Sequence, residues 1–322
     1  MKIVPVKKNE HDVGVPDIPE GSPWPPPCTL LIHAEATQYV VYEIGDEDQV
    51  PEHERPKVTA LVGADCPDDM VLWRYIDIPK LYMLLAHGEL HFTPAERLRA
   101  AEGYELRLPM KTIARAQAQI DAQLQALALD EQTAARHRQF FMPDDSQNLR
   151  IYAVSCWHIN SRENNAFWSS YVPHGGVAIK TTLGRIKLAY EAHWRQNLLA
   201  HRNVLAARVE YIDYETDDFK KIPFAIGVED VFHKAKFFEF EQEFRLVLST
   251  MARTDEAVAD HCRVPIDVAT LIEEIVIGPN PKHMTDFIVK DLATRAGLDP
   301  AIVRSSRVGS QTEVDKLFPR AK

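Results

Sequence analysis

The sequence predicts an α+β fold, with a mixed, mostly antiparallel sheet as its core, helices flanking the sheet and one long inserted helix. Strand-like and helix-like segments follow each other without the strict alternation of a doubly wound parallel sheet. The chain has 322 residues, of which 45% are hydrophobic, and this is enough to bury a sizeable core. The sequence contains no repeat of fixed period.

Residues 1–69 are expected to form a proline-rich N-terminal arm with short strands. Prolines crowd the segment VPDIPEGSPWPPPC, where they fix extended backbone and remove hydrogen-bond donors. We therefore expect residues 1 to about 27 to be an arm rather than a folded unit. Residues 29–43 have the composition of two short strands, and a second polar, proline-marked stretch follows from Gly45 to Asp69.

Residues 70–322 are expected to form a single α+β domain. VLWRYI is typical of a strand, and IPKLYMLLAHG of a helix that ends at Gly88, because glycine tolerates the left-handed conformation of a helix cap. ELHFTP then predicts a strand that ends at Pro94.

Residues 110–138 are expected to form one long helical insertion. Its apolar stripe is narrow and consists of Ile113, Ile120, Leu124 and Leu127. A narrow stripe suits packing against one neighbouring helix or a partner subunit. We therefore expect this helix to be a contact for a homo-oligomer or a protein partner.

The rest of the chain continues the mixture of elements. RIYAVSCW, GGVAIKTT and VLAARVEYIDYE predict strands, and so do EFEQEFRLVLST, HCRVPIDV, EEIVIGP and AIVRSS. Helices are expected at NNAFWSSYV, LGRIKLAYEAHWRQNLLA, VEDVFHKAKFF and KHMTDFIVKDLATRAG.

Charge and cysteine usage limit the classes of function. The net charge is −10 with a pI near 5.7, which disfavours non-specific binding to nucleic acids. The four cysteines lie far apart, as reduced thiols do in a reducing compartment. No secretory signal follows Met1 and no stretch of eighteen apolar residues occurs. We expect a cytoplasmic protein without a membrane partner.

The segment from Glu239 to Arg245 is the strongest candidate for a site. In a strand, alternate side chains would place Phe238, Phe240, Phe244, Leu246 and Leu248 on the core face, and Glu239, Glu241, Glu243 and Arg245 on the other. Neighbouring carboxylates in a cleft shift their pKa, bind a metal or stabilise a cation. The alternative is the solvated face of an amphipathic strand.

Two further segments carry candidate ligand-binding side chains. Trp168 and Tyr171 lie three residues apart in a helical segment, a spacing suited to stacking on a planar ligand or to a core contact. Arg74 lies inside an apolar strand and requires an anion or a set of hydrogen-bond acceptors. A ligand phosphate or carboxylate suits its guanidinium, and the alternative is an ion pair with a glutamate of the 239–243 segment. Histidines and cysteines show no metal-ligand spacing, so no metal site is predicted.

The order of six motifs resembles a widespread prokaryotic family known only as a domain of unknown function. The motifs are Trp73-Arg-Tyr75, Leu90-His-Phe-Thr-Pro94, Val154-Ser-Cys-Trp-His158, Phe167-Trp-Ser-Ser-Tyr171, Gly176-Val-Ala-Ile-Lys180 and Phe238-Glu-Phe-Glu-Gln-Glu-Phe-Arg245. The family's N-D-P-F/Y-E segment is replaced here by Arg99-Ala-Ala-Glu-Gly-Tyr-Glu105.

The order of an arginine, a serine and an E-x-E motif is more distantly similar to ADP-ribosyltransferases. This resemblance implies an NAD-consuming enzyme with NAD as its substrate, of the kind used as a toxin or as a phage-defence effector. It implies that Arg74 holds the NAD phosphates or ribose, that Ser155 supports the nicotinamide ribose, that Glu243 is the catalytic carboxylate and that Glu241 is the acceptor-side one. Tyr75, Trp168 or Tyr171 would stack on nicotinamide, and Arg245 completes the implied cofactor-binding set.

Two other functions remain open at this point. One is a metal-dependent nuclease or phosphoesterase that uses Glu239, Glu241 and Glu243 with Lys236. The other is a non-catalytic ligand-binding or interaction module, in which the arm and the long helix are the contact elements. The identity of the macromolecular or small-molecule acceptor is not encoded in any motif.

Overall fold

The computed structural model describes residues 66–127, 129–142, 146–194, 204–219, 229–249, 262–279 and 281–308, together with five backbone strands in residues 1–62. The chain divides into two compact units, Met1–Val62 and Gly63–Lys322. The division therefore lies a few residues before the expected boundary between residues 69 and 70.

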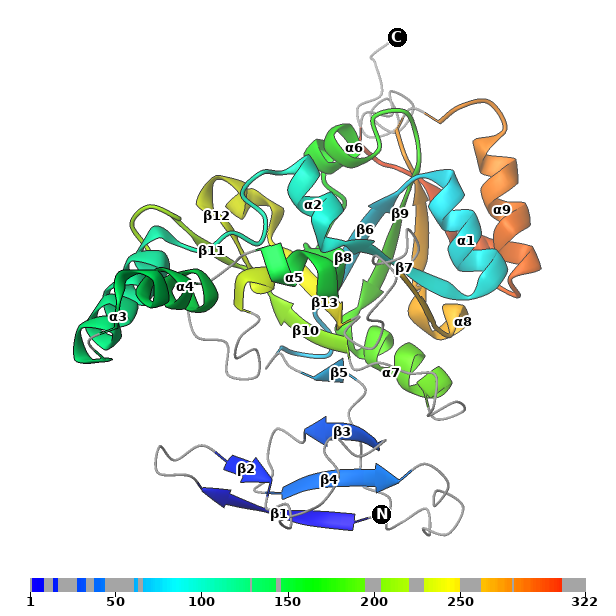
Figure 1. Ribbon diagram of the computed structural model, residues 1–322. Helices are drawn as coiled ribbons and strands as arrows, with labels where there is room; N and C mark the ends of the chain where they lie inside the picture. The colour runs from blue at the N-terminus through cyan, green and yellow to red at the C-terminus, as the bar shows by residue number, and fades with distance from the viewer. Residues whose placement is uncertain are drawn as a thin grey trace. The chain divides into compact units, whose positions relative to one another are not determined.

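The first unit contains a four-stranded antiparallel sheet with the order β2-β1-β4-β3 (Figure 1). Its strands are β1 (Lys2–Lys8), β2 (Gly14–Pro16), β3 (Cys28–Ile32) and β4 (Gln38–Glu43), and β5 (Leu61–Val62) follows them. The two strands expected within residues 29–43 are confirmed as β3 and β4. The expectation of an arm over residues 1–27 is wrong for β1 and β2, because backbone hydrogen bonds pair β1 with both β2 and β4.

The second unit has the predicted α+β architecture, with a mixed and mostly antiparallel sheet of nine strands. Seven of them follow the order β16-β15-β9-β6-β8-β13-β10, while β7 pairs with the first part of β8 and β14 pairs with β7. Their bounds are β6 (Val71–Ile76), β7 (Glu89–Pro94), β8 (Tyr152–Ile159), β9 (Val177–Thr182), β10 (Val204–Arg208), β13 (Glu243–Ser249), β14 (Cys262–Pro265), β15 (Glu274–Ile277) and β16 (Val303–Ser305). A separate parallel pair is formed by β11 (Glu210–Ile212) and β12 (His233–Ala235).

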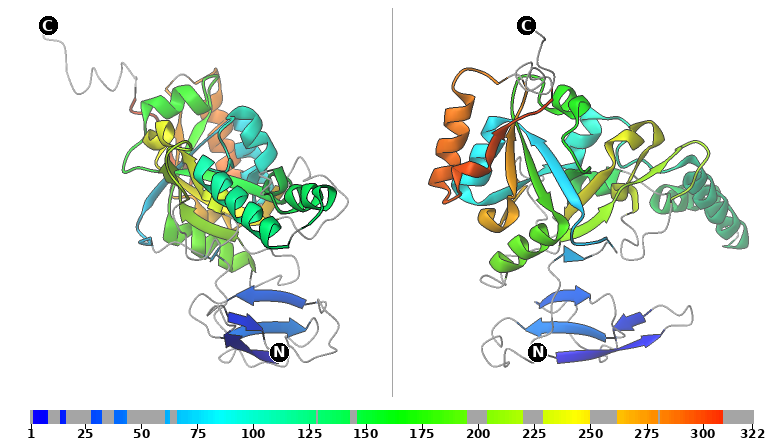
Figure 2. Two further views of the ribbon diagram at one scale, coloured as in Figure 1. Left: turned by 60° about the vertical axis from the view of Figure 1, so that its left-hand side comes forward. Right: turned by 180° about the vertical axis from the view of Figure 1, so that it is seen from behind.

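Helices surround this sheet, with α1 and α9 side by side at one end of the unit and α3 and α4 at the other (Figures 1 and 2). The α-helices are α1 (Ile78–His87), α2 (Ala95–Ala101), α3 (Met110–Leu127), α4 (Glu131–Phe141), α5 (Ser146–Ile151), α6 (Asn165–Tyr171), α7 (Leu183–Trp194), α8 (Val268–Leu271) and α9 (Thr285–Arg295). Three short 3₁₀ helices are η3 (Glu229–Phe232), η4 (Lys236–Glu241) and η5 (Pro300–Ile302). As expected, α1 ends at Gly88, which has a φ of 64°.

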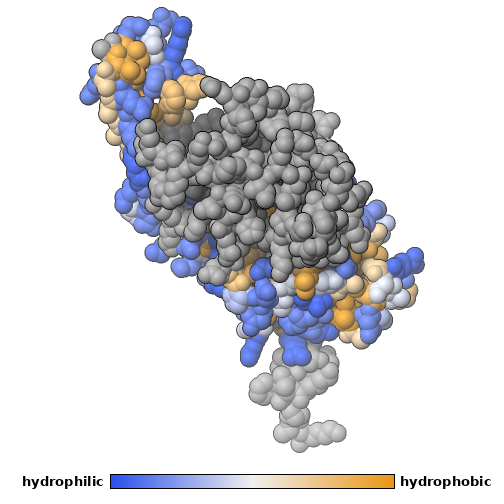
Figure 3. Space-filling model, turned by 90° about the horizontal axis from the view of Figure 1, so that it is seen from below, coloured by the Kyte–Doolittle hydropathy of each residue, from blue (hydrophilic) through white to orange (hydrophobic). Residues whose placement is uncertain are grey.

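The prediction of one long helix over residues 110–138 is wrong, because two helices form a hairpin there. A new helix begins after Asp130, whose side chain accepts a hydrogen bond from the Thr133 N–H and thereby caps α4. Arg138 of α4 reaches back to Asp121 of α3 at 3.1 Å. Figure 3 shows a mainly hydrophilic surface along this hairpin, with hydrophobic residues gathered at its outer end.

The predictions for the segment before β13 are also wrong. Residues 229–241 form η3, β12 and η4 instead of a single helix, and β13 begins only at Glu243. Gln242 separates η4 from β13 with a φ of 45°, a left-handed conformation in which a strand cannot continue. Phe238 and Phe240 therefore do not lie on the core face of a strand, and Phe240 is 57% exposed.

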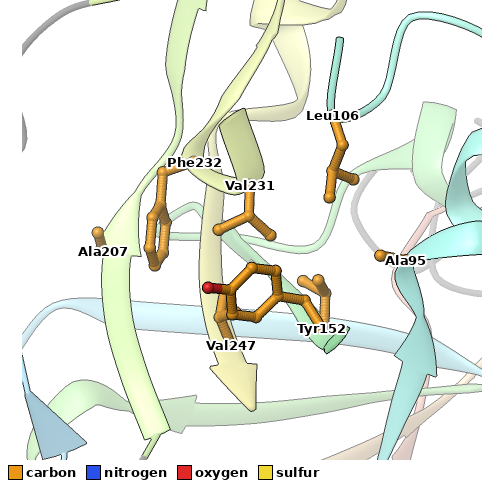
Figure 4. Packing of buried hydrophobic residues seen from close by; sticks show 8 residues of the cluster. Ala95, Leu106, Tyr152, Ala207, Val231, Phe232 and Val247 are labelled. Atoms are coloured by element: carbon orange, nitrogen blue, oxygen red, sulfur yellow. The ribbon is translucent and has the colours of Figure 1, made fainter. Parts of the chain in front are cut away.

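Both faces of the central sheet are buried, and one of them carries two apolar clusters. Residues paired across neighbouring strands point to the same face, so Trp73, His158 and Glu243 share a face. Tyr152, Val154 and Val247 on this face pack against residues that include Val231 and Phe232 (Figure 4). The second cluster joins Trp73 and Tyr75 to Phe167, Trp168 and Val172 of the α6 region.

Replacement of Gly176 by alanine is expected to destabilise the second unit. A Cβ atom there would meet the Ile76 carbonyl oxygen and would lie 2.8 Å from Val172 Cγ1, so backbone atoms must shift. We expect a loss of about 1–3 kcal/mol in the free energy of unfolding, measured by urea denaturation. Gly103→Ala is the matched control, because a Cβ atom at Gly103 meets nothing within 4 Å. Equal effects of the two substitutions would contradict the close approach at Gly176.

Candidate active site

The carboxylates of Glu241 and Glu243 reach one common site because the chain bends between them. Glu241 ends η4 and Glu243 opens β13, with the left-handed Gln242 between the two. Gln242 accepts a hydrogen bond from the Ile159 N–H through its carbonyl oxygen at 2.9 Å, which holds the bend against β8. Both carboxylates are almost completely buried, with exposed fractions of 5% and 3%.

Arg245 is the most deeply buried charge of this site. Its guanidinium donates three hydrogen bonds, to Glu243 Oε2 at 2.7 Å, to Glu105 Oε1 at 2.7 Å and to the Val231 carbonyl oxygen at 2.8 Å. Because charged groups are not left unpaired in the interior, these three partners are what make burial of the guanidinium possible. The ion pairs with Glu105 and Glu243 raise the pKa of Arg245 against the effect of burial.

Lys234 of β12 supplies the second buried cation. Its ammonium lies 2.9 Å from Glu243 Oε1, 2.5 Å from Glu241 Oε2 and 2.9 Å from Glu102 Oε2, and Glu105 Oε1 is at 3.4 Å. Burial lowers and these carboxylates raise the pKa of Lys234, with a net upward shift. Lys234 is therefore a permanent cation, not a nucleophilic amine.

Glu241 and Glu243 share a proton. Burial, the hydrogen bond to Glu243 and the negative charge of Glu243 raise the pKa of Glu241 to about 8. Although burial opposes it, the positive charges of Arg245 and Lys234 hold the pKa of Glu243 well below its usual range. At neutral pH, Glu241 is therefore protonated and donates a hydrogen bond to the ionised Glu243 carboxylate. The two neighbouring carboxyl groups thus differ in charge.

Three ring side chains border this pair of carboxyl groups. The Tyr171 hydroxyl is hydrogen-bonded to Glu241, while the side chain as a whole is 38% exposed. His158 donates a hydrogen bond from Nδ1 to the Glu241 carbonyl oxygen at 2.9 Å, and it stacks on Phe167 with ring centroids 4.2 Å apart. The Tyr211 hydroxyl accepts a hydrogen bond from the Glu243 N–H at 2.8 Å. Tyr171 is the member of this set through which the site borders the surface.

Arg74 and Ser155 are not brought to this site. Arg74 pairs with Ile179 across the sheet, and Ser155 alternates with Cys156 and His158, so both side chains point to the face opposite Glu243. Arg74 donates to the His91 carbonyl oxygen at 2.7 Å and lies 5.6 Å from the Trp157 ring centroid. Burial lowers the pKa of Arg74 to about 10, so the guanidinium keeps its charge at neutral pH.

The aromatic residues that were candidates for stacking on a ligand lie in different environments. Tyr75 and Trp168 are buried against each other with ring centroids 4.8 Å apart, in the core-contact role that the sequence left open. The Tyr75 hydroxyl accepts from the Asn164 N–H at 2.8 Å, and Trp168 Nε1 donates to Glu163 at 3.2 Å. Tyr171 and Arg245, in contrast, both contact the pair of carboxyl groups.

Two acidic residues of the site were not expected from the sequence. Glu102 and Glu105 come from the segment after α2, where the resemblance shows a replaced motif and therefore offers no role. No signal in the sequence marked them, because the burial of Glu105 next to Leu106 appears only in the folded structure. The pattern of polar and apolar residues along the sequence does not reveal that Glu105 pairs with Arg245, which lies 140 residues away.

The residues proposed for a metal-dependent site do not assemble. Glu239 and Lys236 are exposed on η4, and the Lys234 ammonium lies between Glu102, Glu241 and Glu243. In the described part of the chain, no group of three or more His, Cys, Asp and Glu side chains has an arrangement suited to a metal ion.

Comparisons with known proteins do not test the family prediction. No family model, no curated protein and no solved structure matches the chain. Among the described helices, none is long and apolar enough to cross a membrane.

Substitution of Arg245 by methionine is expected to be strongly destabilising. The change removes the donor of both Glu105 and Glu243 and leaves two buried carboxylates short of positive charge. We expect a loss of about 3–5 kcal/mol in the free energy of unfolding, measured by urea denaturation. Arg295→Met is the control, because the ion pair of Arg295 with Asp291 is largely solvent-exposed and contributes little to stability. A similar small loss in both variants would refute the importance of the buried network.

Stability is expected to fall with rising pH between about 4.5 and 8 through the titration of Glu241. A carboxyl group with a raised pKa in the folded state stabilises fully below its ordinary value of 4.5, and this contribution is lost as the pH rises through about 8. One proton corresponds to a slope approaching about −1.4 kcal/mol per pH unit. The measurement is urea unfolding across this range for wild type and Glu241→Gln, whose amide keeps a donor to Glu243. An equally steep slope in the variant would assign the effect to another group.

Proposed function

We propose that this protein is an NAD-consuming enzyme of the ADP-ribosyltransferase type. The observation that carries the proposal is the pair Glu241 and Glu243, two adjacent carboxyl groups of which one is protonated and the other ionised at neutral pH. Carboxyl groups whose environments drive their pKa values apart are the usual device by which glycosidic bonds are broken at neutral pH. The resemblance to ADP-ribosyltransferases singles out Glu241 and Glu243, and the structure brings the same two carboxyl groups together.

The two carboxyl groups fit two successive tasks. When the bond between nicotinamide and ribose breaks, its electron pair leaves with nicotinamide, which departs neutral, and positive charge develops on the ribose. The fixed carboxylate of Glu243 is suited to stabilise this charge. An acceptor then bonds to the same ribose carbon and must lose a proton, which the ionised form of Glu241 can accept.

The proposal gives the surrounding residues distinct parts. Lys234 and Arg245 are positioning residues, because they hold Glu243 ionised and in place through both of its oxygens. Tyr171 is the candidate for contact with the nicotinamide ring, because its ring is partly exposed and its hydroxyl bonds Glu241. Arg74 and Ser155 have no part in the reaction, because they lie on the other face of the sheet.

A toxin or phage-defence role would be consistent with this chemistry, since enzymes that consume NAD act on the pool of an essential metabolite. The acceptor is water in the simplest case, and a small molecule or macromolecule in the case of transfer. The α3–α4 hairpin is the part of the second unit that we propose for contact with a partner or with another copy of the chain. Its exposed apolar residues include Leu127 and Phe140.

The second candidate is a non-catalytic ligand-binding module. The observation in its favour is that both oxygens of Glu243 are engaged by buried cations while the side chain is only 3% exposed. Such a network stabilises and orders a fold without chemistry. The two candidates differ in one result, which is the release of nicotinamide.

Purified protein is expected to release nicotinamide from NAD, and Glu243→Gln is expected to reduce the rate at least about a hundredfold, as for loss of a charge-stabilising group. For the wild type, the rate of transfer or hydrolysis should rise as the pH increases toward 8, because only ionised Glu241 accepts a proton. Chromatographic quantification of nicotinamide, with and without cell lysate as a source of acceptor, provides the measurement.

The matched control is Glu239→Gln, since Glu239 belongs to the same segment but is exposed on η4. Circular dichroism and urea unfolding establish that each variant is folded. Release that persists unchanged in folded Glu243→Gln would eliminate the transferase proposal. No release by the wild type under either condition would favour the binding module.

A further inference from the structure

His158 is a titratable side chain of the candidate site to which the proposed reaction gives no part. It lies directly opposite Glu243 in the pairing of β8 with β13, and the Cβ atoms of such opposite residues are about 5 Å apart. Its ring stacks on Phe167, and its ring centroid lies 4.9 Å from that of Tyr171. Because Tyr171 is the partly exposed member of the site, His158 lies next to the side chain at which a substrate would enter.

The hydrogen bonds of the His158 ring determine which nitrogen carries the proton. Nδ1 lies 2.9 Å from the Glu241 carbonyl oxygen, and a carbonyl oxygen only accepts, so the proton of the neutral ring is on Nδ1. No described residue donates a hydrogen bond to Nε2. In the described part of the chain, Nε2 is also not one of the fully enclosed atoms without a partner, so it keeps contact with solvent although the residue is only 2% exposed. The ring therefore presents an unprotonated nitrogen and is held in place through the other one.

The groups around the ring keep it neutral at neutral pH. The titratable groups that face it are Glu243 of β13, Lys234 of β12, Glu241 of η4, Tyr171 of α6 and Tyr75 of β6. Burial lowers the pKa of His158 most strongly and Lys234 adds to this effect, whereas the Glu243 carboxylate and the bond to the carbonyl oxygen raise it. The net shift is downward. Because the pKa of Glu241 is about 8, most molecules at neutral pH have a histidine that can accept a proton and a Glu241 that cannot.

We propose that His158 is the general base of the site at neutral pH, with Nε2 accepting the proton of the acceptor that attacks the ribose. This inference rests on the proposed NAD reaction and names its base. With water as the acceptor, an oxygen lone pair forms the new bond to the ribose carbon and the proton of water passes to Nε2. The bond to nicotinamide breaks, and its electron pair leaves with nicotinamide. The imidazolium lies opposite the Glu243 carboxylate, which stabilises it, and then returns the proton to solvent. The products are ADP-ribose, nicotinamide and one proton.

The pH profile of the wild type is the first test. If Glu241 were the only base, kcat for nicotinamide release would fall about tenfold for each pH unit well below its pKa of about 8. With His158 as the base, kcat is expected to level off between pH 7 and pH 6.5, because the histidine remains unprotonated there. A fall that continues with the full slope through pH 6.5 would overturn the proposal.

Two substitutions separate a proton-accepting role from a purely structural one. In His158→Asn the amide takes the position of Nδ1 and keeps a donor for the Glu241 carbonyl oxygen, but it offers no base. In His158→Gln the amide takes the position of Nε2, so the donor is lost as well. We expect kcat of His158→Asn at pH 7 to fall about tenfold with an unchanged KM for NAD, because only about a tenth of Glu241 is ionised there. At pH 9, where Glu241 is ionised, the deficit is expected to shrink to about twofold.

The matched control is His174→Asn, because His174 is exposed in the turn after α6. Circular dichroism and urea unfolding establish that each variant is folded, and the wild-type pH profile decides the question if neither His158 variant folds. Wild-type activity in folded His158→Asn at pH 7, with loss only in His158→Gln, would assign His158 to positioning and overturn the inference while the NAD reaction stands. Absence of nicotinamide release by the wild type would refute the NAD reaction and the base with it.

Discussion

The ion network of Arg245, Lys234, Glu105 and Glu243 is the constraint on which the second unit depends. It links the middle of β13 to β12, to η3 through the Val231 carbonyl oxygen, and to the segment after α2. The segment after α2 is distant in sequence from η3, β12 and β13, and the charges of Glu105, Lys234, Glu243 and Arg245 cannot remain buried alone. The network therefore specifies how the segments pack around the sheet as well as where the carboxylates lie.

The same network determines on which side of the sheet the candidate site lies. Strand pairing places Trp73, His158 and Glu243 on one face, where apolar clusters flank the charges on both sides. Burial raises the pKa of Glu241, whereas the positive charges of Arg245 and Lys234 lower that of Glu243, and the two pKa values are thereby separated. Arg74 shares the opposite face with Trp157, so its charge contributes to packing there rather than to the site.

The bend at Gln242 gives the E-x-E motif its geometry. In a continuous strand, Glu241 and Glu243 would stand side by side on one face at the full spacing of two residues. Here a 3₁₀ turn delivers Glu241 and a strand delivers Glu243, and the left-handed residue between them turns both carboxyl groups toward Lys234. Burial of Glu241 and its close approach to Glu243 raise the pKa of Glu241 against the opposing effect of Lys234, so Glu241 is an acid at neutral pH.

Hydrophobic periodicity and runs of charge are local signals, so the sequence predicted the α+β class, most strands of the sheet and a candidate site at Glu241, Glu243 and Arg245. The fold was needed to show that the 110–138 segment breaks at Asp130, that Glu102 and Glu105 join the site, and that Arg74 and Ser155 face away from it. Pairing of charges far apart in sequence depends on strand register and on burial. Neither quantity is encoded in the spacing of residues along one segment.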